Sequence, residues 1–477
     1  MVKIISLPYF EVRRKLLEGE IKMLEYLQET LERIEERKEI NAFITLNNEA
    51  FKEAERLERK LKGKEKVGKL FGALIAVKDN ISTKGIKTTC ASKILYNYIP
   101  PFDATVIDKI KKEDGIILGK TNMDEFGMGS TTELSFFGPT LNPLDKSRVA
   151  GGSSGGSGAA LVDYQANLAL GADTGGSIRC PASFCGILGL KPTYGLVSRY
   201  GLISYANSLE QIGPMARCVK DLALLLEVIA GYDPRDNTTL KEEILLNNRI
   251  VKRAAIIKEL VGEGLEKGVR NEFYKALEIF KDMKIEIDEV SLEILDFALP
   301  CYYIIAMAEA SSNLARYDGI RYGLRIKETS ENFFSYIERL RGEGFGEEVK
   351  KRIILGTFIL SAGYYEQFYL KAQRIRKLMR LEFERLFKSY DLIFSPTMPS
   401  IAYKVGEKIK NPLEMYLGDV ETVVANLVGI PALSIPCGYS NGMPVGLQIM
   451  GKPLNEATLL SIAQEFELYK GDKFAKY

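Results

Sequence analysis

The chain has 477 residues, of which 46% are hydrophobic and 27% charged, an ordinary balance for a globular protein with a sizeable core. It contains 65 basic and 63 acidic residues, and this formal net charge of +2 argues against extensive nucleic-acid binding by the chain itself. It contains no histidine, which excludes Ser-His-Asp and Cys-His catalytic groups and histidine-ligated zinc. A general base must therefore be Lys, Asp, Glu, Tyr or a thiolate.

The cysteines and the N-terminus indicate the compartment. Six cysteines are scattered without a Cys-x-x-Cys pair, which predicts reduced, mostly buried thiols. The first ten residues lack both the apolar core and the small-residue cleavage site of a signal peptide, and no apolar run approaches membrane-spanning length. We therefore expect a cytoplasmic protein that does not enter a membrane.

The N-terminal third begins with a helical pattern and then changes character. Residues from about 9 to 62 are predicted to be helical, because apolar residues such as Leu24, Leu27 and Leu31 recur at helical spacing. Residues 74–77 form a continuous apolar run that ends in the polar Lys78-Asp-Asn. This pattern predicts a buried strand that delivers polar side chains at its carboxyl end, where open α/β sheets place ligands.

The rest of the chain alternates between predicted strands and helices. Residues 103–119 predict a helix followed by a strand, and residues 141–215 are rich in Gly, Ser and Pro, with a strand-like run over 166–171. This alternation predicts an α/β fold with helices on both faces of the sheet. The remaining predicted elements are helices near 219–230 and 266–281, a long helical stretch over 292–388, and strands near 253–258, 391–396, 432–436 and 445–450.

Two glycine-serine segments stand out in the middle of the chain. Residues 151–158 are Gly-Gly-Ser-Ser-Gly-Gly-Ser-Gly, and residues 173–179 are Asp-Thr-Gly-Gly-Ser-Ile-Arg. A flexible linker is one interpretation of the first segment. Its position between apolar runs, and the second Gly-Gly-Ser that follows, favour instead a backbone packed closely around a reacting atom.

Phosphate binding is a further interpretation of the glycine pattern. Residues 115–121, Gly-Ile-Ile-Leu-Gly-Lys-Thr, resemble a phosphate-binding loop but are one residue short between the glycines. Residues 262–264, Gly-Glu-Gly, likewise miss the dinucleotide-binding spacing. We therefore do not expect a nucleotide site in this chain.

Three blocks, residues 76–80, 151–157 and 173–182, resemble in order and separation the signature blocks of the amidase signature family. The resemblance covers nearly the whole chain and implies one amidase domain over residues 1–477, built on a mixed, twisted sheet of about eleven strands with helices on both faces. Within it we distinguish an N-terminal helical segment (1–65), a signature core (66–230) and a remainder with the substrate-recognition helices (231–477).

The resemblance also implies a catalytic mechanism. It makes Ser177 the nucleophile, Ser153 a bridging serine and Lys78 the base, with a cis peptide between Gly152 and Ser153. Lysine acts as a base only when neutral, so Lys78 is expected to be buried with a lowered pKa, not to be a salt-bridged surface lysine. The tetrahedral oxyanion would be stabilised by backbone amides, and the family pattern assigns these to Thr174, Gly175, Gly176 and Ser177.

Segments outside the shared signature resemble one branch of this family, the A subunits of the glutamyl-tRNA(Gln)/aspartyl-tRNA(Asn) amidotransferases. These segments are residues 123–130, 191–201, 208–214, 317–323, 352–358, 363–365 and 415–419. The implied activity is that of a glutaminase, in which Ser177 takes the glutamyl group and releases ammonia. The acceptor, glutamate- or aspartate-charged tRNA or both, stays open.

The branch also implies a substrate site and partners. Arg352 would bind the α-carboxylate of glutamine, through a guanidinium suited to two parallel hydrogen bonds, and Asp419 its α-ammonium, while Tyr303, Ser130 and Thr174 would position the substrate. Ordinary surface ion pairs are the alternative for Arg352 and Asp419. The implied complex is a heterotrimer with a B subunit, which uses ATP and magnesium and binds most of the misacylated tRNA, and a small C subunit. No cofactor or metal is expected in this chain.

Two other functions remain as alternatives. One is a stand-alone amidase of small or fatty amides, with the same catalytic residues and no partner. The other is a non-catalytic binding scaffold that kept the fold, against which the intact set of Lys78, Ser153 and Ser177 argues.

Overall fold

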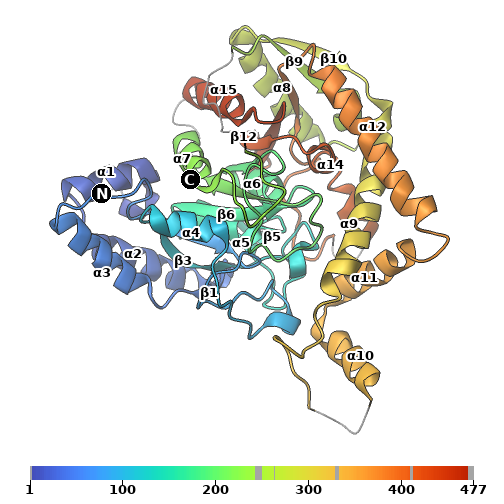
Figure 1. The fold of residues 1–477 in the computed structure, drawn as a ribbon. Helices are drawn as coiled ribbons and strands as arrows, with labels where there is room; N and C mark the ends of the chain where they lie inside the picture. Colours follow the sequence, from blue (N-terminus) through green and yellow to red (C-terminus); the bar gives the residue numbers. More distant parts are fainter. Residues whose placement is uncertain (1–2, 242–249, 263, 328–331, 409–411, 471–477) are drawn as a thin grey trace.

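The computed structural model describes residues 3–241, 250–262, 264–327, 332–408 and 412–470. Its centre is an eleven-stranded sheet (Figure 1). Its strand order is β1-β3-β2-β6-β8-β7-β12-β13-β11-β9-β10. The pairs β2–β3, β2–β6, β9–β10 and β9–β11 are parallel, and the others are antiparallel. This mixed sheet confirms the predicted α/β fold. The strands are β1 (Phe43–Leu46), β2 (Leu74–Lys78), β3 (Ile116–Thr121), β6 (Leu168–Asp173), β7 (Leu188–Lys191), β8 (Gln211–Ala216), β9 (Arg253–Ile257), β10 (Glu286–Val290), β11 (Leu392–Pro396), β12 (Ala432–Ser440) and β13 (Met443–Gly451), with a separate hairpin of β4 (Leu141–Asn142) and β5 (Asp145–Val149).

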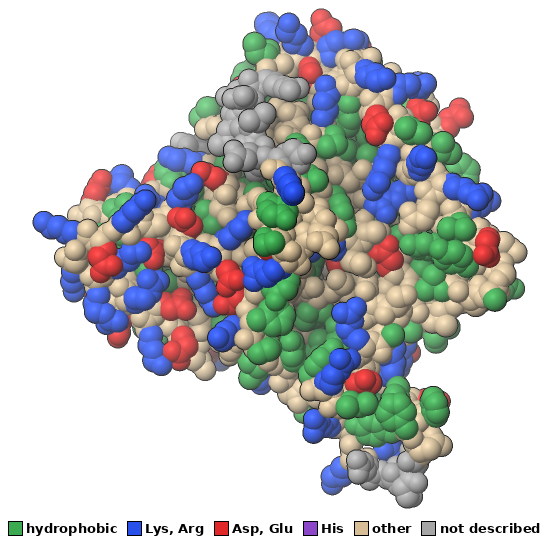
Figure 2. Space-filling model, in the orientation of Figure 1, with side chains coloured by type: hydrophobic (Ala, Val, Ile, Leu, Met, Phe, Trp, Pro, Cys, Tyr) green, Lys and Arg blue, Asp and Glu red, His purple; other side chains and the backbone are tan. Residues whose placement is uncertain are grey.

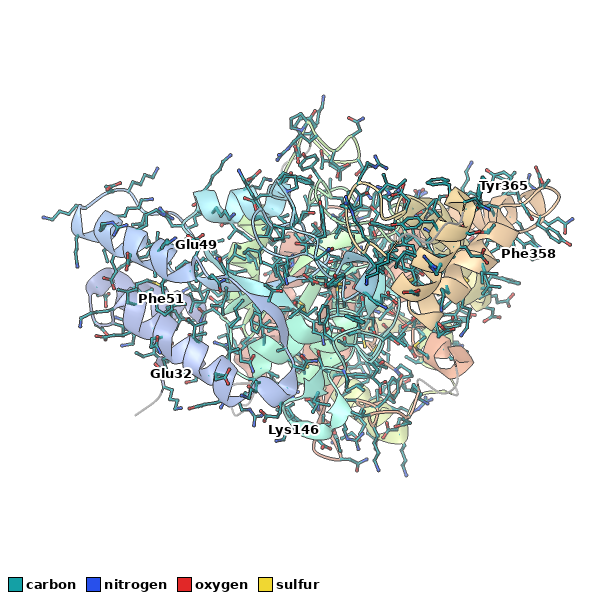
Figure 3. All side chains as sticks on the ribbon, turned by 90° about the horizontal axis from the view of Figure 1, so that it is seen from below. Glu32, Glu49, Phe51, Lys146, Phe358 and Tyr365 are labelled. Carbon is teal, nitrogen blue, oxygen red and sulfur yellow. The ribbon has the colours of Figure 1, made fainter. Side chains whose placement is uncertain are left out.

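Helices surround the sheet, with the N-terminal helices on one side of the molecule and α9, α11 and α12 on the other (Figure 1). Seen from below, Glu32 and Phe51 of the N-terminal helices lie at the opposite end from Phe358 and Tyr365 (Figure 3). The helices are α1 (Tyr9–Glu18), α2 (Met23–Glu36), α3 (Ala50–Lys62), α4 (Thr105–Lys112), α5 (Gly155–Val162), α6 (Arg179–Cys185), α7 (Val219–Ile229), α8 (Lys267–Asp282), α9 (Ala298–Leu314), α10 (Phe333–Gly344), α11 (Glu347–Ile359), α12 (Lys371–Leu386), α13 (Pro412–Leu417), α14 (Val423–Val428) and α15 (Glu456–Lys470).

The central strands are buried on both faces. Ile75 and Val77 of β2 pack into one hydrophobic core, whereas Ala76 between them packs into another on the opposite face. Leu170 and Ala169 of the adjacent β6 divide in the same way, because successive side chains of a strand point to opposite sides. The continuous apolar run predicted as a buried strand is therefore confirmed.

The glycine-serine segment is the start of a buried helix. α5 begins at Gly155, and every residue from Gly151 to Leu161 is buried. A Cβ atom at Gly156 would lie 2.5 Å from the carbonyl oxygen of Ala42 and 2.5 Å from the amide nitrogen of Asn122. Glycine is required there because the helix packs directly against neighbouring backbone, so the flexible-linker interpretation is wrong.

The prediction of helix from about residue 9 to 62 is confirmed for α1, α2 and α3, and it is wrong for the strand between α2 and α3. Phe43–Leu46 forms β1, which pairs antiparallel with β3 at the edge of the sheet. Its Phe-Ile-Thr-Leu sequence suits a strand, but the short segment is surrounded by helical periodicity. The pairing with β3 decides its structure.

The segment that resembles a phosphate loop is strand β3. Lys120 is completely buried, and its Nζ donates to the carbonyl oxygen of Ile81 at 2.6 Å and to the Oγ1 of Thr88 at 2.8 Å, with Asp79 at 3.6 Å. A lysine held in this way is structural. The weaker Gly-Glu-Gly match at 262–264 falls partly outside the described residues.

One helical stretch is longer and more apolar than expected, since no apolar run was expected to reach membrane-spanning length. Glu293–Leu314 has 22 residues and a mean hydropathy of 1.3, enough by length and composition to cross a membrane. Within its most apolar 18 residues, 56% are buried inside the protein. It is weak evidence for a membrane span, because buried core helices meet the same criteria.

The prediction of mostly buried, unpaired cysteines is confirmed. All six are free, and all are buried except Cys218, which is partly exposed. They behave as small apolar core residues.

Candidate active site

Lys78 occupies the carboxyl end of β2 and is 1% exposed. Its Nζ donates to the Oγ of Ser153 at 2.7 Å and to the carbonyl oxygen of Ala172 at 2.9 Å. Burial lowers the pKa of Lys78 to about 7, although the carboxylates of Asp124 and Asp173 act in the opposite direction. A large fraction of this amine is therefore neutral near pH 7, as a general base requires.

Ser153 follows the cis peptide expected between Gly152 and Ser153. A Cβ atom at Gly152 would lie 2.2 Å from the Oδ2 of Asp124 and 2.6 Å from the amide nitrogen of Thr131. Only glycine fits at this position, because the Asp124 carboxylate packs against the backbone just before Ser153.

Ser177 lies in the loop between β6 and α6, and only 8% of it is exposed. Because β2 and β6 are adjacent and parallel, they deliver Lys78 and this loop to the same edge of the sheet. The amide of Ser154 donates to the carbonyl oxygen of Ser177 at 3.1 Å, which joins the two serine loops. Within the described residues, no hydrogen bond joins the hydroxyls of Ser153 and Ser177. The transfer of a proton between them therefore stays a prediction.

The glycines before Ser177 are fixed by close packing. A Cβ atom at Gly175 would lie 2.5 Å from the Tyr302 ring, and one at Gly176 would lie 2.3 Å from the Oγ1 of Thr422. The amide of Gly176 donates to the Oδ1 of Asp173 at 2.9 Å, so this predicted oxyanion donor has a partner in the structure. The oxyanion role of the amides of Thr174, Gly175 and Ser177 stays a prediction.

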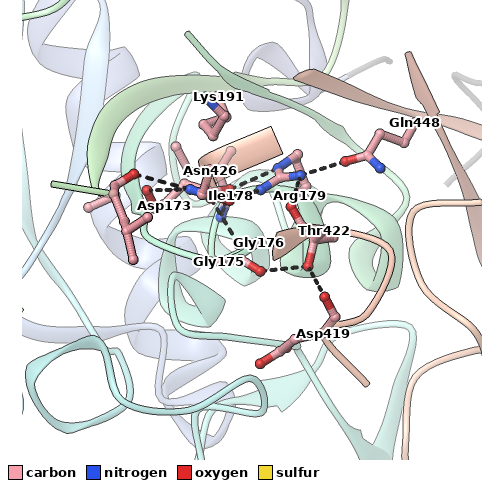
Figure 4. A network of polar contacts seen from close by, with 12 residues as sticks. Asp173, Gly175, Gly176, Ile178, Arg179, Lys191, Asp419, Thr422, Asn426 and Gln448 are labelled. Carbon is pink, nitrogen blue, oxygen red and sulfur yellow. Dashed lines mark hydrogen bonds and ion pairs between the residues drawn. The ribbon is translucent and has the colours of Figure 1, made fainter. Parts of the chain in front are cut away.

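A buried polar network holds this loop (Figure 4). Asp173 and Arg179 are both fully buried and form a bidentate pair, with Nη2–Oδ1 at 2.9 Å and Nε–Oδ2 at 3.1 Å. Asn426 donates to the same carboxylate at 2.9 Å, and Arg179 donates to the Oε1 of Gln448 at 2.5 Å. Burial alone would raise the pKa of Asp173, but Arg179 outweighs burial and holds the pKa well below its usual range. The sequence motif contains Asp173 and Arg179, but nothing in the motif alone indicated this role.

Arg352, the predicted carboxylate receptor, is 2% exposed on α11. Its guanidinium carbon lies 5.7, 5.4 and 5.2 Å from the ring centres of Tyr205, Tyr303 and Tyr416. Its Nη1 donates to the Oη of Tyr205 and its Nε to the Oε1 of Glu348, each at 2.8 Å. The alternative of a surface ion pair is wrong for Arg352. Sequence reasoning gave no role to Tyr205, Glu348 and Tyr416. Tyr416 lies in the segment 415–419 quoted for the resemblance, and Glu348 precedes Arg352 by four residues, the spacing of a helical ion pair, so these two had a signal in the sequence.

Asp419, the predicted ammonium receptor, is connected to Arg352 through Tyr303. The Oη of Tyr303 donates to the Oδ2 of Asp419 at 2.7 Å, while the same ring packs against Arg352. Burial raises the pKa of Asp419 to about 7. The Oγ1 of Thr422 donates to the carbonyl oxygens of Asp419, at 3.1 Å, and of Gly175, at 2.5 Å, which links the proposed substrate site to the nucleophile loop (Figure 4).

Two further predicted substrate residues lie near the catalytic loops. Ser130 is 3% exposed, and within the described residues its Oγ has no hydrogen-bond partner. Its carbonyl carbon would lie 2.8 Å from a Cβ atom at Gly152, which places Ser130 beside the bridging-serine loop. Thr174 is also buried, directly after β6. The contact of Ser130 and Thr174 with a substrate stays a prediction.

Comparison with known proteins shows the family to which this chain belongs. The family model described as Amidase matches residues 25–460. The A subunit of glutamyl-tRNA(Gln) amidotransferase from Archaeoglobus fulgidus is 55% identical over 452 residues, which cover 94% of this chain and 96% of that protein. The crystal structure of the corresponding protein from Thermotoga maritima superposes with a TM-score of 0.80 at 40% identity, over 97% of this chain and 94% of that one. The native peptide amidase from Stenotrophomonas maltophilia has a TM-score of 0.82 at 26% identity, over 97% and 96%. Of these three relatives, the two with the higher sequence identity are A subunits of glutamyl-tRNA(Gln) amidotransferases. The chain therefore belongs to the amidase family.

Proposed function

We propose that this protein is the glutaminase subunit of a tRNA-dependent amidotransferase, and that it hydrolyses glutamine through an acyl-enzyme on Ser177. The observation that carries the proposal is the buried Lys78, hydrogen-bonded to Ser153 at 2.7 Å and with a pKa of about 7. Relatives about half identical to this chain are named as the A subunit of glutamyl-tRNA(Gln) amidotransferase, which supports the assignment.

The proposed reaction uses one proton relay in both directions. Neutral Lys78 takes the proton of Ser153 while Ser153 takes that of Ser177, and the Ser177 oxygen bonds to the carboxamide carbon of glutamine. The relay returns the proton to the leaving nitrogen as the C–N bond breaks, so ammonia departs and the γ-glutamyl ester remains. A water molecule then attacks the ester carbon and gives one proton to the relay. The relay returns this proton to the Ser177 oxygen as the ester C–O bond breaks, which releases glutamate and restores the serine. The amides of Thr174, Gly175 and Ser177, whose loop also holds the Gly176 amide on Asp173, stabilise the oxyanion at each step.

Substrate recognition in this proposal rests on two opposite charges separated by a tyrosine. Arg352 binds the α-carboxylate and Asp419 the α-ammonium, while Tyr303, Ser130 and Thr174 position the substrate between them. The arrangement is supported by the contacts of Tyr303, which packs on Arg352 at 5.4 Å and donates to Asp419 at 2.7 Å.

This charge arrangement also favours glutamine over the substrates of the alternative function. A stand-alone amidase with the same fold, such as the peptide amidase among the structural relatives, is the rival. A small or fatty amide carries no charges to pair with the buried Arg352 and the half-buried Asp419, and it would leave both without a charged ligand.

The remaining parts of the proposal concern the whole assembly. Ammonia passes to a B subunit, which uses ATP and magnesium and binds most of the misacylated tRNA, and a small C subunit completes a cytoplasmic heterotrimer. The near-neutral charge of this chain supports tRNA binding elsewhere, and Figure 2 shows acidic and basic side chains interspersed over much of one face. Residues 1–477 are proposed to form one amidase domain, since segments 1–65, 66–230 and 231–477 all contribute strands to a single sheet.

The test is a glutaminase assay of the chain alone, and then with B and C subunits, ATP and misacylated tRNA. We expect ammonia release from glutamine that rises in the assembled complex, and glutamine-dependent amidation of the charged tRNA. Hydrolysis of hydrophobic amides without any hydrolysis of glutamine would establish the stand-alone amidase instead. Failure of a serine-reactive probe to label Ser177 would favour the non-catalytic scaffold.

A further inference from the structure

Glu348 is an acidic residue inside the proposed carboxylate-binding site. It lies one helical turn before Arg352 on α11, and its Oε1 accepts a hydrogen bond from the Arg352 Nε at 2.8 Å. The two side chains are only 8% and 3% exposed. Buried ion pairs of this kind contribute little net stability, because desolvation of both charges offsets their attraction. The position of Glu348 therefore calls for an explanation other than stability.

Glu348 also ties two elements of the site together. The Oη of Tyr416, on α13 just before Asp419, donates to the same Oε1 atom at 2.5 Å. Lys351 approaches the other carboxylate oxygen at 3.3 Å. Burial acts to raise the pKa of Glu348, but Arg352 and Tyr416 outweigh it and the net pKa is lowered, so the carboxylate is ionised at neutral pH.

The guanidinium of Arg352 is held on two of its three nitrogens. Nε donates to Glu348 and Nη1 to Tyr205. The ring centres of Tyr205, Tyr303 and Tyr416 lie between 5.2 and 5.7 Å from the guanidinium carbon. Within the described residues, Nη2 makes no hydrogen bond with the protein. A guanidinium has five N–H groups in a fixed planar fork. Fixing Nε and Nη1 therefore fixes the direction in which the N–H groups of Nη2 point.

We propose that Glu348 is a positioning residue, which orients the Arg352 guanidinium so that its Nη2 edge receives the α-carboxylate of glutamine. The inference rests on the proposed function and deepens it. Glu348 acts through Arg352 and does not contact the substrate. Its loss leaves Arg352 charged but free to rotate, so substrate binding weakens while the chemistry at Ser177 is unchanged.

The test compares glutamine kinetics of complexes carrying single variants of this chain. Glu348→Ala is expected to raise the KM for glutamine about ten-fold or more, with kcat within about two-fold of wild type. Glu348→Gln retains an oxygen that accepts from Arg352 and Tyr416, and it is expected to raise KM less than about three-fold. Tyr416→Phe keeps the ring but removes the bond to Glu348, and it is expected to raise KM about three-fold, which provides a readout if Glu348→Ala does not fold.

Glu347→Ala is the matched control. It is an acidic residue on the same helix, paired only with Lys350 among the described residues, and its side chain is 91% exposed. Its KM and kcat are expected to equal those of wild type. The double variant Glu348→Ala/Arg352→Ala is expected to have the KM of Arg352→Ala alone, because a residue that acts through Arg352 has no effect once Arg352 is absent.

Several results would overturn the positioning role. A KM for Glu348→Ala within about two-fold of wild type would make the ion pair incidental, and a lowered KM would make Glu348 a competitor of the substrate carboxylate. Equal KM values for the Ala and Gln variants, or additive effects in the double variant, would also contradict it. These outcomes leave wild-type glutamine turnover intact, whereas a wild-type complex that does not hydrolyse glutamine overturns the proposed function and this inference together.

Discussion

The Nζ of Lys78 lies 2.7 Å from the Oγ of Ser153, in an interior where no histidine is available to act as base. The second contact of Lys78, with the carbonyl oxygen of Ala172 at 2.9 Å, fixes the amine from the strand next to its own. This carbonyl accepts one N–H of a neutral amine and leaves its lone pair free for the serine, and it belongs to the strand that leads into the nucleophile loop. The proposed base, Lys78, and the loop of the proposed nucleophile, Ser177, are thus positioned by the same pair of parallel strands.

Replacement of Lys78 tests its role as base. Lys78→Ala is expected to reduce kcat about 10² to 10⁴-fold at every pH between about 6 and 9, because no other side chain takes the serine proton. Lys78→Arg should be equally impaired, since arginine keeps its proton throughout this range. Either variant with a nearly wild-type rate, measured as ammonia released from glutamine, excludes Lys78 as the base.

The pH dependence of kcat follows from the pKa of Lys78. Burial lowers this pKa to about 7, so the amine is mostly neutral above pH 7 and mostly protonated below it. At saturating glutamine, kcat is therefore expected to fall about ten-fold for each pH unit below about 7 and to level off above about pH 8. A profile that stays flat down to about pH 5.5 would contradict a lysine base.

Ser177 is tested by trapping the acyl-enzyme. Rapid quenching of the wild-type enzyme with glutamine should yield a protein whose mass is increased by one γ-glutamyl group, located by peptide mapping on Ser177. Ser177→Ala is expected to fold normally and to show no such adduct. An adduct on the alanine variant would place the nucleophile elsewhere.

Arg352 and Asp419 are expected to control KM more than kcat. Arg352→Ala should raise the KM for glutamine about 100-fold, because the α-carboxylate loses a charged hydrogen-bond partner. An unchanged KM would remove Arg352 from the site. The control is Arg253→Ala, which affects an exposed ion pair with Asp288 at 2.6 Å far from α11 in sequence, and it should leave KM unchanged.

The pKa of Asp419 predicts a second pH effect, on KM. Burial raises this pKa to about 7, so below pH 7 the carboxyl group is protonated and loses its charge interaction with the substrate ammonium. The KM for glutamine should rise about ten-fold between about pH 8 and pH 6. Asp419→Asn should have a high KM that no longer varies over this range, and a variation identical to wild type would assign the effect to another group.

The Asp173–Arg179 pair predicts a stability effect. Arg179→Leu leaves the Asp173 carboxylate buried without its counter-charge, at an expected cost of about 3–5 kcal/mol in the free energy of unfolding. Because the pKa of Asp173 is held below its usual value, the contribution of the pair is present at neutral pH and is lost only as the pH falls through that lowered pKa.

Urea unfolding at neutral pH measures this effect. The matched control is Arg253→Leu, in the exposed pair with Asp288, whose loss should destabilise the protein far less because solvent screens an exposed ion pair. Equal destabilisation by the two variants would show that burial of the Asp173–Arg179 pair makes no difference to its energetic role.

The sequence by itself determined the chemistry and the fold class of this protein. The absence of histidine restricted the base, the apolar run before Lys78 predicted a buried lysine at a strand end, and alternating elements predicted the α/β sheet. These are local properties, because hydrophobic periodicity and residue type are set by neighbours along the chain. The signature blocks then indicated which serines to assign.

Tertiary structure decided what depends on residues far apart in the chain. Phe43–Leu46 became a strand through its pairing with β3. The helix α5 lies where it does because Gly156 fits against the backbone of Ala42 and Asn122. The surroundings of Arg352 likewise come in part from Tyr205 and Tyr416, which lie outside α11 and far from Arg352 in the chain. The hydrogen-bond partner and the burial of a charged group depend on three-dimensional packing, which no local pattern encodes.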